Sequence, residues 1–161
     1  MGSKSDLEIV RGAFDVFDDF GVDFEARILS AHRTPEEAAE FAANAEANGA
    51  KVIICAAGMA AHLGGVVAAH TTLPVIGIPM VSEPFKALDS LLAIVQMPPG
   101  IPVATVGVNA SLNAAILAVE MLSLADEQLA GRLAEYKKNL CKKIEKANEE
   151  LKELKYEYKT N

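Results

Sequence analysis

The sequence predicts an α/β domain in which an open parallel β-sheet is covered by helices on both faces. Helical and extended segments alternate along the 161 residues, as expected when each strand is followed by a crossover helix. Most of the predicted strands are nearly continuous apolar runs, which is typical of strands buried on both faces. The length fits a single domain, 1–161, in which residues 126–161 form a charged helical extension.

The first predicted helix begins near Ser5 and ends at Gly21. Ser5 and Glu8 have the spacing of a capping box, and apolar residues then recur every three or four positions. Gly21 supplies the stop. In residues 24–29, apolar side chains alternate with charged ones, which predicts a half-buried strand.

The second predicted helix begins after Thr34, with Pro35 at the first helical position, and runs to Asn48 and Gly49. The remaining elements follow from apolar runs and helical periodicity. They are strands at 52–56, 74–78 and 102–108, and helices at 61–69, 87–96, 111–123 and 126–155.

The last predicted helix carries one narrow apolar stripe. Its members are Leu129, Leu133, Tyr136, Leu140, Ile144, Ala147, Leu151, Leu154 and Tyr158. Such a stripe favours packing across the same domain or onto a neighbouring subunit. A coiled coil with a separate partner is the alternative, although two successive steps of four around Leu140 break a strict heptad.

The composition of the first residues predicts a further strand upstream of Gly2. Gly2 to Ser5 has the composition of a turn between a strand and a helix, yet no strand precedes it. We expect about six to eight apolar residues upstream, a typical strand length. That strand would lie between segments 24–29 and 52–56, whose backbone groups would otherwise lack partners.

Charge is distributed unevenly, and this bears on partners. Residues 1–125 carry six Lys or Arg and fourteen Asp or Glu, so this part would repel a phosphate backbone and argues against nucleic-acid binding. Residues 52–122 hold only four charges. Because a lone small domain has too much surface to hide so much apolar sequence, we expect a homo-oligomer with a large interface.

Several other classes of protein are disfavoured. The uncharged stretch 52–82 is interrupted by glycine, histidine and proline, so it does not predict a membrane span. No apolar leader is present, and a cytoplasmic protein is expected. The two cysteines lack a CxxC pattern, and three scattered histidines make a metal site improbable. Cys55, in an apolar strand, is predicted to be a packed thiol.

Candidate functional residues gather in three segments that follow predicted strands or precede helices. In a parallel sheet such segments meet at the carboxyl ends of the strands, where ligands bind. Their contents suit a phosphorylated sugar, because Ser3 can donate a hydroxyl, Arg33 offers a bidentate fork and Asp6 can accept from sugar hydroxyls. The segments are 2–6, 30–35 and 57–65.

Histidine is the candidate for proton transfer. His32 lies at a strand end, beside Arg33 and just before a helix, and both neighbours favour its neutral form. His62 is either a second polar group of the pocket or a hydrogen-bonded residue at a helix start. His70 lies near a helix end, where a capping or interface role is expected.

Taken together, the segments resemble the class I N5-carboxyaminoimidazole ribonucleotide mutases of purine (IMP) biosynthesis. The resemblance covers residues 1–125 and is carried by MGSKSD, SAHRTP, AAGMAAHLGG, LPVIGIP and LDSLLAIVQMPPGIPVATVGV. It implies a flavodoxin-like three-layer αβα fold, an octamer, and no metal or organic cofactor. It also implies an isomerase that moves a carboxylate from exocyclic N5 to ring C4 of 5-aminoimidazole ribonucleotide, by loss and recapture of CO2.

The resemblance also implies roles for individual residues. His32 matches the catalytic histidine of the family, and the other matching residues bind substrate. Ser3 and Arg33 match phosphate contacts and Asp6 a ribose contact. Ser30 belongs to the matching SAHRTP segment. Ala57, Gly58, His62 and Leu63 match the loop around the imidazole and the migrating carboxylate.

Two departures from the family pattern lie in that loop. Met59 stands where the family usually has glycine, and Gly64 replaces a rigid proline. Two alternative functions remain at this point. One is direct carboxylation of aminoimidazole ribonucleotide by CO2, against which His62 and Leu63 argue. The other is a non-catalytic module that binds nucleotide phosphates, against which His32 argues.

Overall fold

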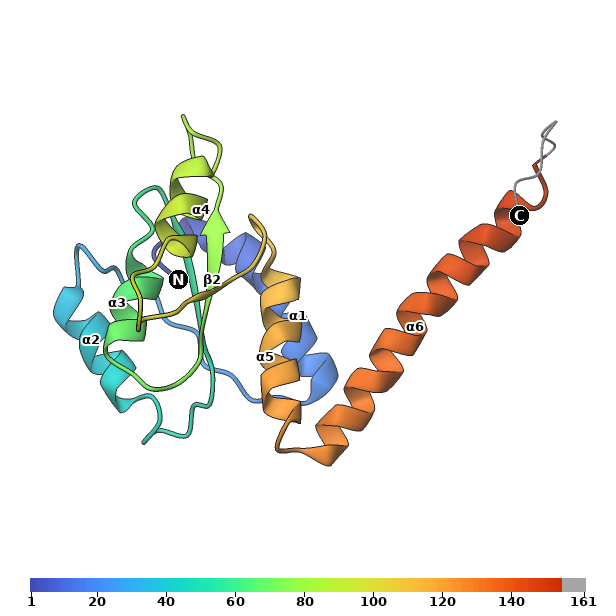
Figure 1. Cartoon of the computed structure of the whole chain (residues 1–161), viewed down its shortest axis with the longest axis horizontal. Coiled ribbons are helices and arrows are strands. Elements are labelled where there is room, and N and C mark those ends of the chain that lie inside the picture. The colour runs from blue at the N-terminus through green and yellow to red at the C-terminus, as the bar shows by residue number, and fades with distance from the viewer. Residues whose placement is uncertain (155–161) are drawn as a thin grey trace.

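The central sheet consists of parallel strands β1 (Ile53–Gly58), β2 (Val75–Met80) and β3 (Ala104–Thr105), in that spatial order. The computed structural model describes residues 1–154, and helices lie on both sides of the sheet (Figure 1). They are the 3-10 helix η1 (Lys4–Asp6), α1 (Leu7–Phe20), α2 (Pro35–Asn44), α3 (Leu63–Ala69), α4 (Leu88–Val95), α5 (Ser111–Ser123) and α6 (Glu127–Leu151). The predicted αβα class is confirmed.

Alternation along the strands divides the core into two layers. Ala56, Ile76 and Ile78 pack with α1 and α5 on one face of the sheet. Ile53 and Cys55 pack with α2 and α3 on the other face. Neighbouring residues of a strand point to opposite faces, so each strand serves both layers. Ile76 and Ile78 are completely buried, and each such side chain stabilises the fold by about 1.5–3 kcal/mol.

The predicted strand at 24–29 is wrong, because this segment is extended but has no strand partner. Its backbone hydrogen bonds in the described chain are to Met1, whose amino group donates to the Arg27 carbonyl (2.8 Å) and whose carbonyl accepts from Leu29 (3.0 Å). Gly2 in turn donates to the Ala56 carbonyl of β1 (2.9 Å). The described chain therefore places Met1 and Gly2 alone between the two segments, and the expected upstream strand stays a prediction.

Several further boundaries differ from expectation, and α2 ends at Asn44 rather than near Gly49. The cap at the first helical turn is Ser3 with Asp6, rather than Ser5 with Glu8, because a turn of 3-10 helix precedes α1. Segment 102–108 forms a strand only at Ala104–Thr105. Beyond it, single backbone bonds from Val106 to Gly77 and from Asn109 to Pro79 follow β2 without forming a regular ladder.

Helix α6 leaves the body of the molecule after its first turns (Figure 1). Asp126 caps it, Leu129 is buried, and Tyr136 packs against Phe20 with ring centroids 5.5 Å apart. Farther along, Leu140 and Ile144 are exposed. Only the beginning of the predicted stripe thus packs on its own domain, and its last member, Tyr158, lies outside the described residues. No helix in residues 1–154 is long and apolar enough to cross a membrane.

Candidate active site

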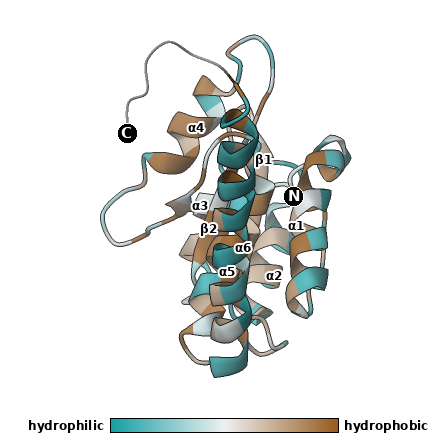
Figure 2. Cartoon of the chain, turned by 90° about the vertical axis from the view of Figure 1, so that its right-hand side faces the viewer, coloured by the Kyte–Doolittle hydropathy of each residue, from teal (hydrophilic) through white to brown (hydrophobic). Residues whose placement is uncertain are grey.

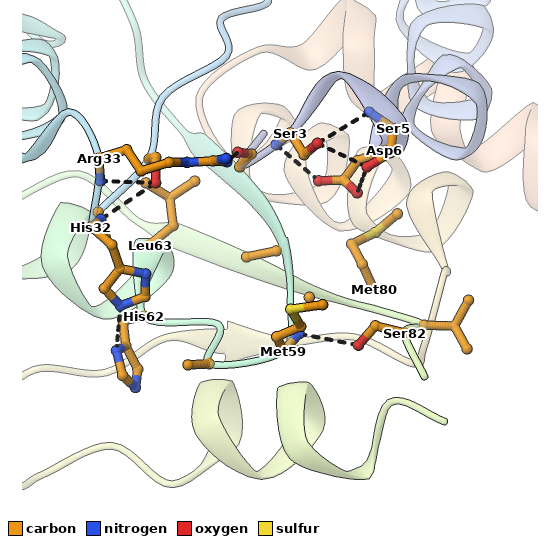
Figure 3. Close-up of a pocket in the computed structure, with 17 residues that line it drawn as sticks. Ser3, Ser5, Asp6, His32, Arg33, Met59, His62, Leu63, Met80 and Ser82 are labelled. Carbon is orange, nitrogen blue, oxygen red and sulfur yellow. Dashed lines mark hydrogen bonds between the residues drawn. The ribbon is translucent and has the colours of Figure 1, made fainter. Parts of the chain in front are cut away.

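A pocket of about 500 Å³ opens at the carboxyl ends of β1 and β2 (Figure 3). All nine residues predicted for the site line it: Ser3, Asp6, Ser30, His32, Arg33, Ala57, Gly58, His62 and Leu63. They come from loops far apart in the sequence, which the parallel sheet brings to one edge. The structure therefore gathers the predicted residues in one place.

The first wall of the pocket is the turn that starts η1. The Ser3 hydroxyl accepts from the backbone N–H of Ser5 (3.3 Å), and the Ser3 N–H donates to a carboxylate oxygen of Asp6 (3.2 Å). The Ser5 hydroxyl donates to the Ser3 hydroxyl oxygen at 2.8 Å. This network fixes both predicted ligand-binding side chains at the helix start, where anions are stabilised.

The environment of Asp6 alters its acidity. Desolvation by partial burial raises the pKa of its carboxyl, while hydrogen bonds from Ser5 and Ser3 oppose the shift. A carboxylate with incomplete solvation is more ready to accept hydrogen bonds from a ligand's hydroxyl groups. Asp6 thus suits the sugar contact that the sequence predicts for it.

The second wall is the turn at residues 30–34, which is stabilised by hydrogen bonds to its own side chains. The Ser30 hydroxyl accepts from the backbone N–H groups of His32 (3.4 Å) and Arg33 (3.2 Å). Thr34 accepts from the Ser30 N–H at 3.0 Å. The Arg33 guanidinium then reaches the Gly2 carbonyl at 3.2 Å. A cation is thereby placed beside the Ser3 turn, which favours an anionic ligand there.

Two histidines face each other at the mouth of the pocket. Nε2 of His32 lies 2.9 Å from Nδ1 of His62, and the rings meet edge to face at a centroid distance of 5.0 Å. His62 immediately precedes α3. One ring must donate an N–H to the other at this distance. The pair is therefore a site where a proton can be held and passed on. His70 is not part of it, because it ends α3 and bonds the Val66 carbonyl.

The third wall includes residues that the sequence did not single out. Met80 ends β2, Val81 and Ser82 follow it, and all three line the pocket with Met59. The strand was predicted to end at Ile78, whereas it ends at Met80. The rule that ligands lie beyond the carboxyl ends of parallel strands could have identified these residues, since they directly follow a predicted strand.

Other reactive groups of the described chain lie elsewhere. Cys55 is buried, and burial raises the pKa of its thiol to about 12, so it is a packed and unreactive group. In residues 1–154, no three His, Cys, Asp or Glu side chains come together in a way that could hold a metal ion. The chemistry available in the pocket is that of histidines, a guanidinium, a carboxylate and hydroxyls.

Sequence comparison identifies relatives of this chain among known proteins. The AIR carboxylase family model matches residues 1–143. N5-carboxyaminoimidazole ribonucleotide mutase from Methanocaldococcus jannaschii is 52% identical over 154 residues, which are 96% of each chain. The chloroplastic phosphoribosylaminoimidazole carboxylase of Vigna aconitifolia is 50% identical over 139 residues, which are 86% of this chain and 25% of that protein.

A solved structure shares the fold. The crystal structure of PurE from Treponema denticola aligns with a TM-score of 0.86 and 31% sequence identity. The alignment covers 94% of this chain and 95% of that one. Sequence and fold therefore point to the same set of relatives.

Proposed function

Because the chain belongs to the AIR carboxylase family, we propose that it isomerises N5-carboxyaminoimidazole ribonucleotide to 4-carboxyaminoimidazole ribonucleotide in de novo purine biosynthesis. The observation that carries the proposal is the pocket itself. It combines a turn at a helix start and a guanidinium, which suit a phosphate, with a histidine pair, which suits proton transfer. The near full-length match to a relative named as the mutase supports the same activity.

The substrate phosphate belongs at the junction of the first two walls. Arg33 supplies the positive charge there, and Ser3 supplies a hydroxyl at the start of a helix. Asp6 lies next to this junction and accepts from the ribose hydroxyls. The base then extends toward His32 and the loop that contains Gly58 and His62. The position of the Arg33 guanidinium next to the Gly2 carbonyl, beside the Ser3 turn, supports this orientation.

The reaction requires that one proton be donated to N5 and that one be removed from C4. Breaking the N5–carboxylate bond releases CO2 and leaves the electron pair on N5, which takes a proton from His32. C4 of the electron-rich ring then attacks CO2, and the C4 proton returns to His32. Atoms and charge balance without an oxidant or a further reactant. Positioning and exclusion of water supply the rate, and the proposal invokes no cofactor.

We also propose that the working form is a homo-oligomer, with eight subunits as the family resemblance implies. The support in this chain is the outer face of α4, which is largely hydrophobic at the edge of the molecule (Figure 2). Phe85, Leu88, Leu92 and Val95 are 50–64% exposed along this face. A second copy of the chain would cover them. The proposed place of action is the cytoplasm, with soluble ribonucleotides as substrates.

Direct carboxylation of aminoimidazole ribonucleotide is the second candidate, since the relative from Vigna aconitifolia is named as a carboxylase. The test offers the purified protein each substrate separately. We expect the 4-carboxy product from N5-carboxyaminoimidazole ribonucleotide without ATP or added bicarbonate. A protein that is active only on aminoimidazole ribonucleotide with bicarbonate would support the carboxylase. Substrate binding without product in either mixture would indicate the binding module.

A further inference from the structure

Met59 combines a strained backbone with an exposed apolar side chain. Its φ is 56°, in the left-handed region that side chains other than glycine rarely adopt, and 62% of its surface is exposed. Such a conformation costs on the order of 1–3 kcal/mol. The side chain adds nothing to either core layer in return. Glycine would suit the fold at least as well, so the methionine points to a ligand.

The surrounding residues hold Met59 in this conformation. Its backbone N–H donates to the Ser82 hydroxyl at 3.3 Å, which ties the loop after β1 to the loop after β2. The preceding Gly58 packs so closely that a Cβ there would lie 3.3 Å from the Met80 carbonyl oxygen. Figure 3 shows Met59 between His62 on one side and Ser82 on the other. The backbone strain is thus associated with a side chain that lines the pocket.

The pocket is lined by apolar as well as polar side chains. The Ser3 turn and Arg33 supply hydroxyls and charge, whereas Met59, Met80 and Val81 line the pocket with apolar side chains. A neutral molecule without strong hydrogen-bonding groups is held best against such an apolar surface, which also keeps water away. CO2, the intermediate of the proposed reaction, is such a molecule.

We propose that Met59 is a specificity-determining residue that retains CO2 between its release from N5 and its capture by C4; this inference rests on the proposed function. CO2 that stays in the pocket forms the C4–carbon bond and gives the 4-carboxy product. CO2 that escapes leaves aminoimidazole ribonucleotide, whose N5 already carries the proton from His32. Met59 therefore determines the ratio of isomerised product to decarboxylated product.

The test is Met59→Gly, with both products quantified by chromatography from N5-carboxyaminoimidazole ribonucleotide. We expect the ratio of 4-carboxy product to aminoimidazole ribonucleotide to fall about tenfold or more, the usual effect of losing an apolar group in a site. The melting temperature should not fall, because glycine accepts the backbone angle. Met59→Leu, which keeps apolar bulk, should restore the ratio to within about threefold.

The outcomes separate the two proposals. If Met59→Gly gives the same product ratio as the unmodified protein, the inference is overturned. The same holds if Met59→Leu loses as much CO2 as Met59→Gly, because apolar bulk would then be irrelevant. If the unmodified protein forms no 4-carboxy product at all, the proposed function is what fails.

Discussion

The facing nitrogens of His32 and His62 limit the charge that the pair can carry. At 2.9 Å only one of these nitrogens can bear a hydrogen, so the pair in this arrangement holds at most one positive charge. A substrate that hydrogen-bonds to Nε2 of His32 must replace His62 as its partner. The pair therefore keeps one proton near the reacting atoms before the substrate binds.

Replacement of His32 tests the proton transfer. We expect His32→Asn to lower kcat by ~10²–10⁴, the usual contribution of a positioned general acid or base, while the substrate still binds. Single-turnover kinetics and calorimetric titration measure the two effects. His70→Asn is the matched control, because His70 caps α3 away from the pocket. Near-normal turnover in His32→Asn would remove this residue from the mechanism.

Replacement of Arg33 tests the phosphate site. A hydrogen bond to a charged group contributes about 1.5–3 kcal/mol, so Arg33→Ala should weaken substrate binding by roughly 10–150-fold. Binding of the unphosphorylated nucleoside should change little. Arg27→Ala serves as a control, because the Arg27 side chain is exposed and paired with Glu25. Equal losses for nucleotide and nucleoside would show that Arg33 does not contact the phosphate.

The raised pKa of Asp6 predicts a pH dependence of stability. Below the ordinary value of 3.8, the carboxyl is protonated in both folded and unfolded chains. Above it, the unfolded chain releases its proton first, so the stability that Asp6 contributes falls until the folded carboxyl also ionises. Asp6→Asn should therefore gain melting temperature relative to the unmodified protein as the pH rises from about 3 to 7. A difference that stays constant or shrinks over this range would contradict the assignment.

The sequence indicates most of the pocket because its chemistry sits where strands end and helices begin. His32 and Arg33 precede Pro35, a residue type that predicts a helix start without any tertiary information. The hydrogen bond between Ser82 and Met59 could not be predicted in this way, since it joins two separate loops. The contact between His32 and His62 is likewise a product of the fold.

At the scale of elements, helices were predicted better than strands for a physical reason. A helix satisfies its hydrogen bonds locally, so caps such as Pro35 and Gly21 suffice to locate it. A strand needs a neighbouring strand, and in the described residues segment 24–29 forms backbone hydrogen bonds with Met1 alone. Its alternating pattern is that of a strand, but the described chain offers no partner for the pairing.

The exposed apolar face of α4 predicts how the chain assembles. Leu92→Glu would place a charge on an apolar face that we expect a second copy to bury, so it should dissociate the oligomer. Leu124→Glu is the control, because Leu124 is 89% exposed and lies after α5, away from that face. Light scattering measures the mass of both variants and of the unmodified protein. An unmodified protein that is a 17.1 kDa monomer at micromolar concentration would refute the interface.

At the scale of the whole molecule, the pocket lies in the part of the chain that packs around the sheet, and α6 projects from that part (Figure 1). The family match ends at residue 143, within α6, so the shared part includes the sheet with its covering helices and most of α6. The exposed apolar positions Leu140 and Ile144 lie near this limit. They suit contacts between subunits better than packing within the chain, which agrees with a homo-oligomer.

The most direct test of the proposed isomerisation follows the carboxylate itself. N5-carboxyaminoimidazole ribonucleotide labelled with ¹³C in its carboxylate is added to the protein in buffer that contains unlabelled bicarbonate and no ATP. Carbon NMR then shows where the label goes. We predict that it appears on C4 of the product with little dilution, because the released CO2 is recaptured before it leaves the pocket. A 4-carboxy product that carries unlabelled carbon from bicarbonate would contradict the isomerase and establish a carboxylase instead.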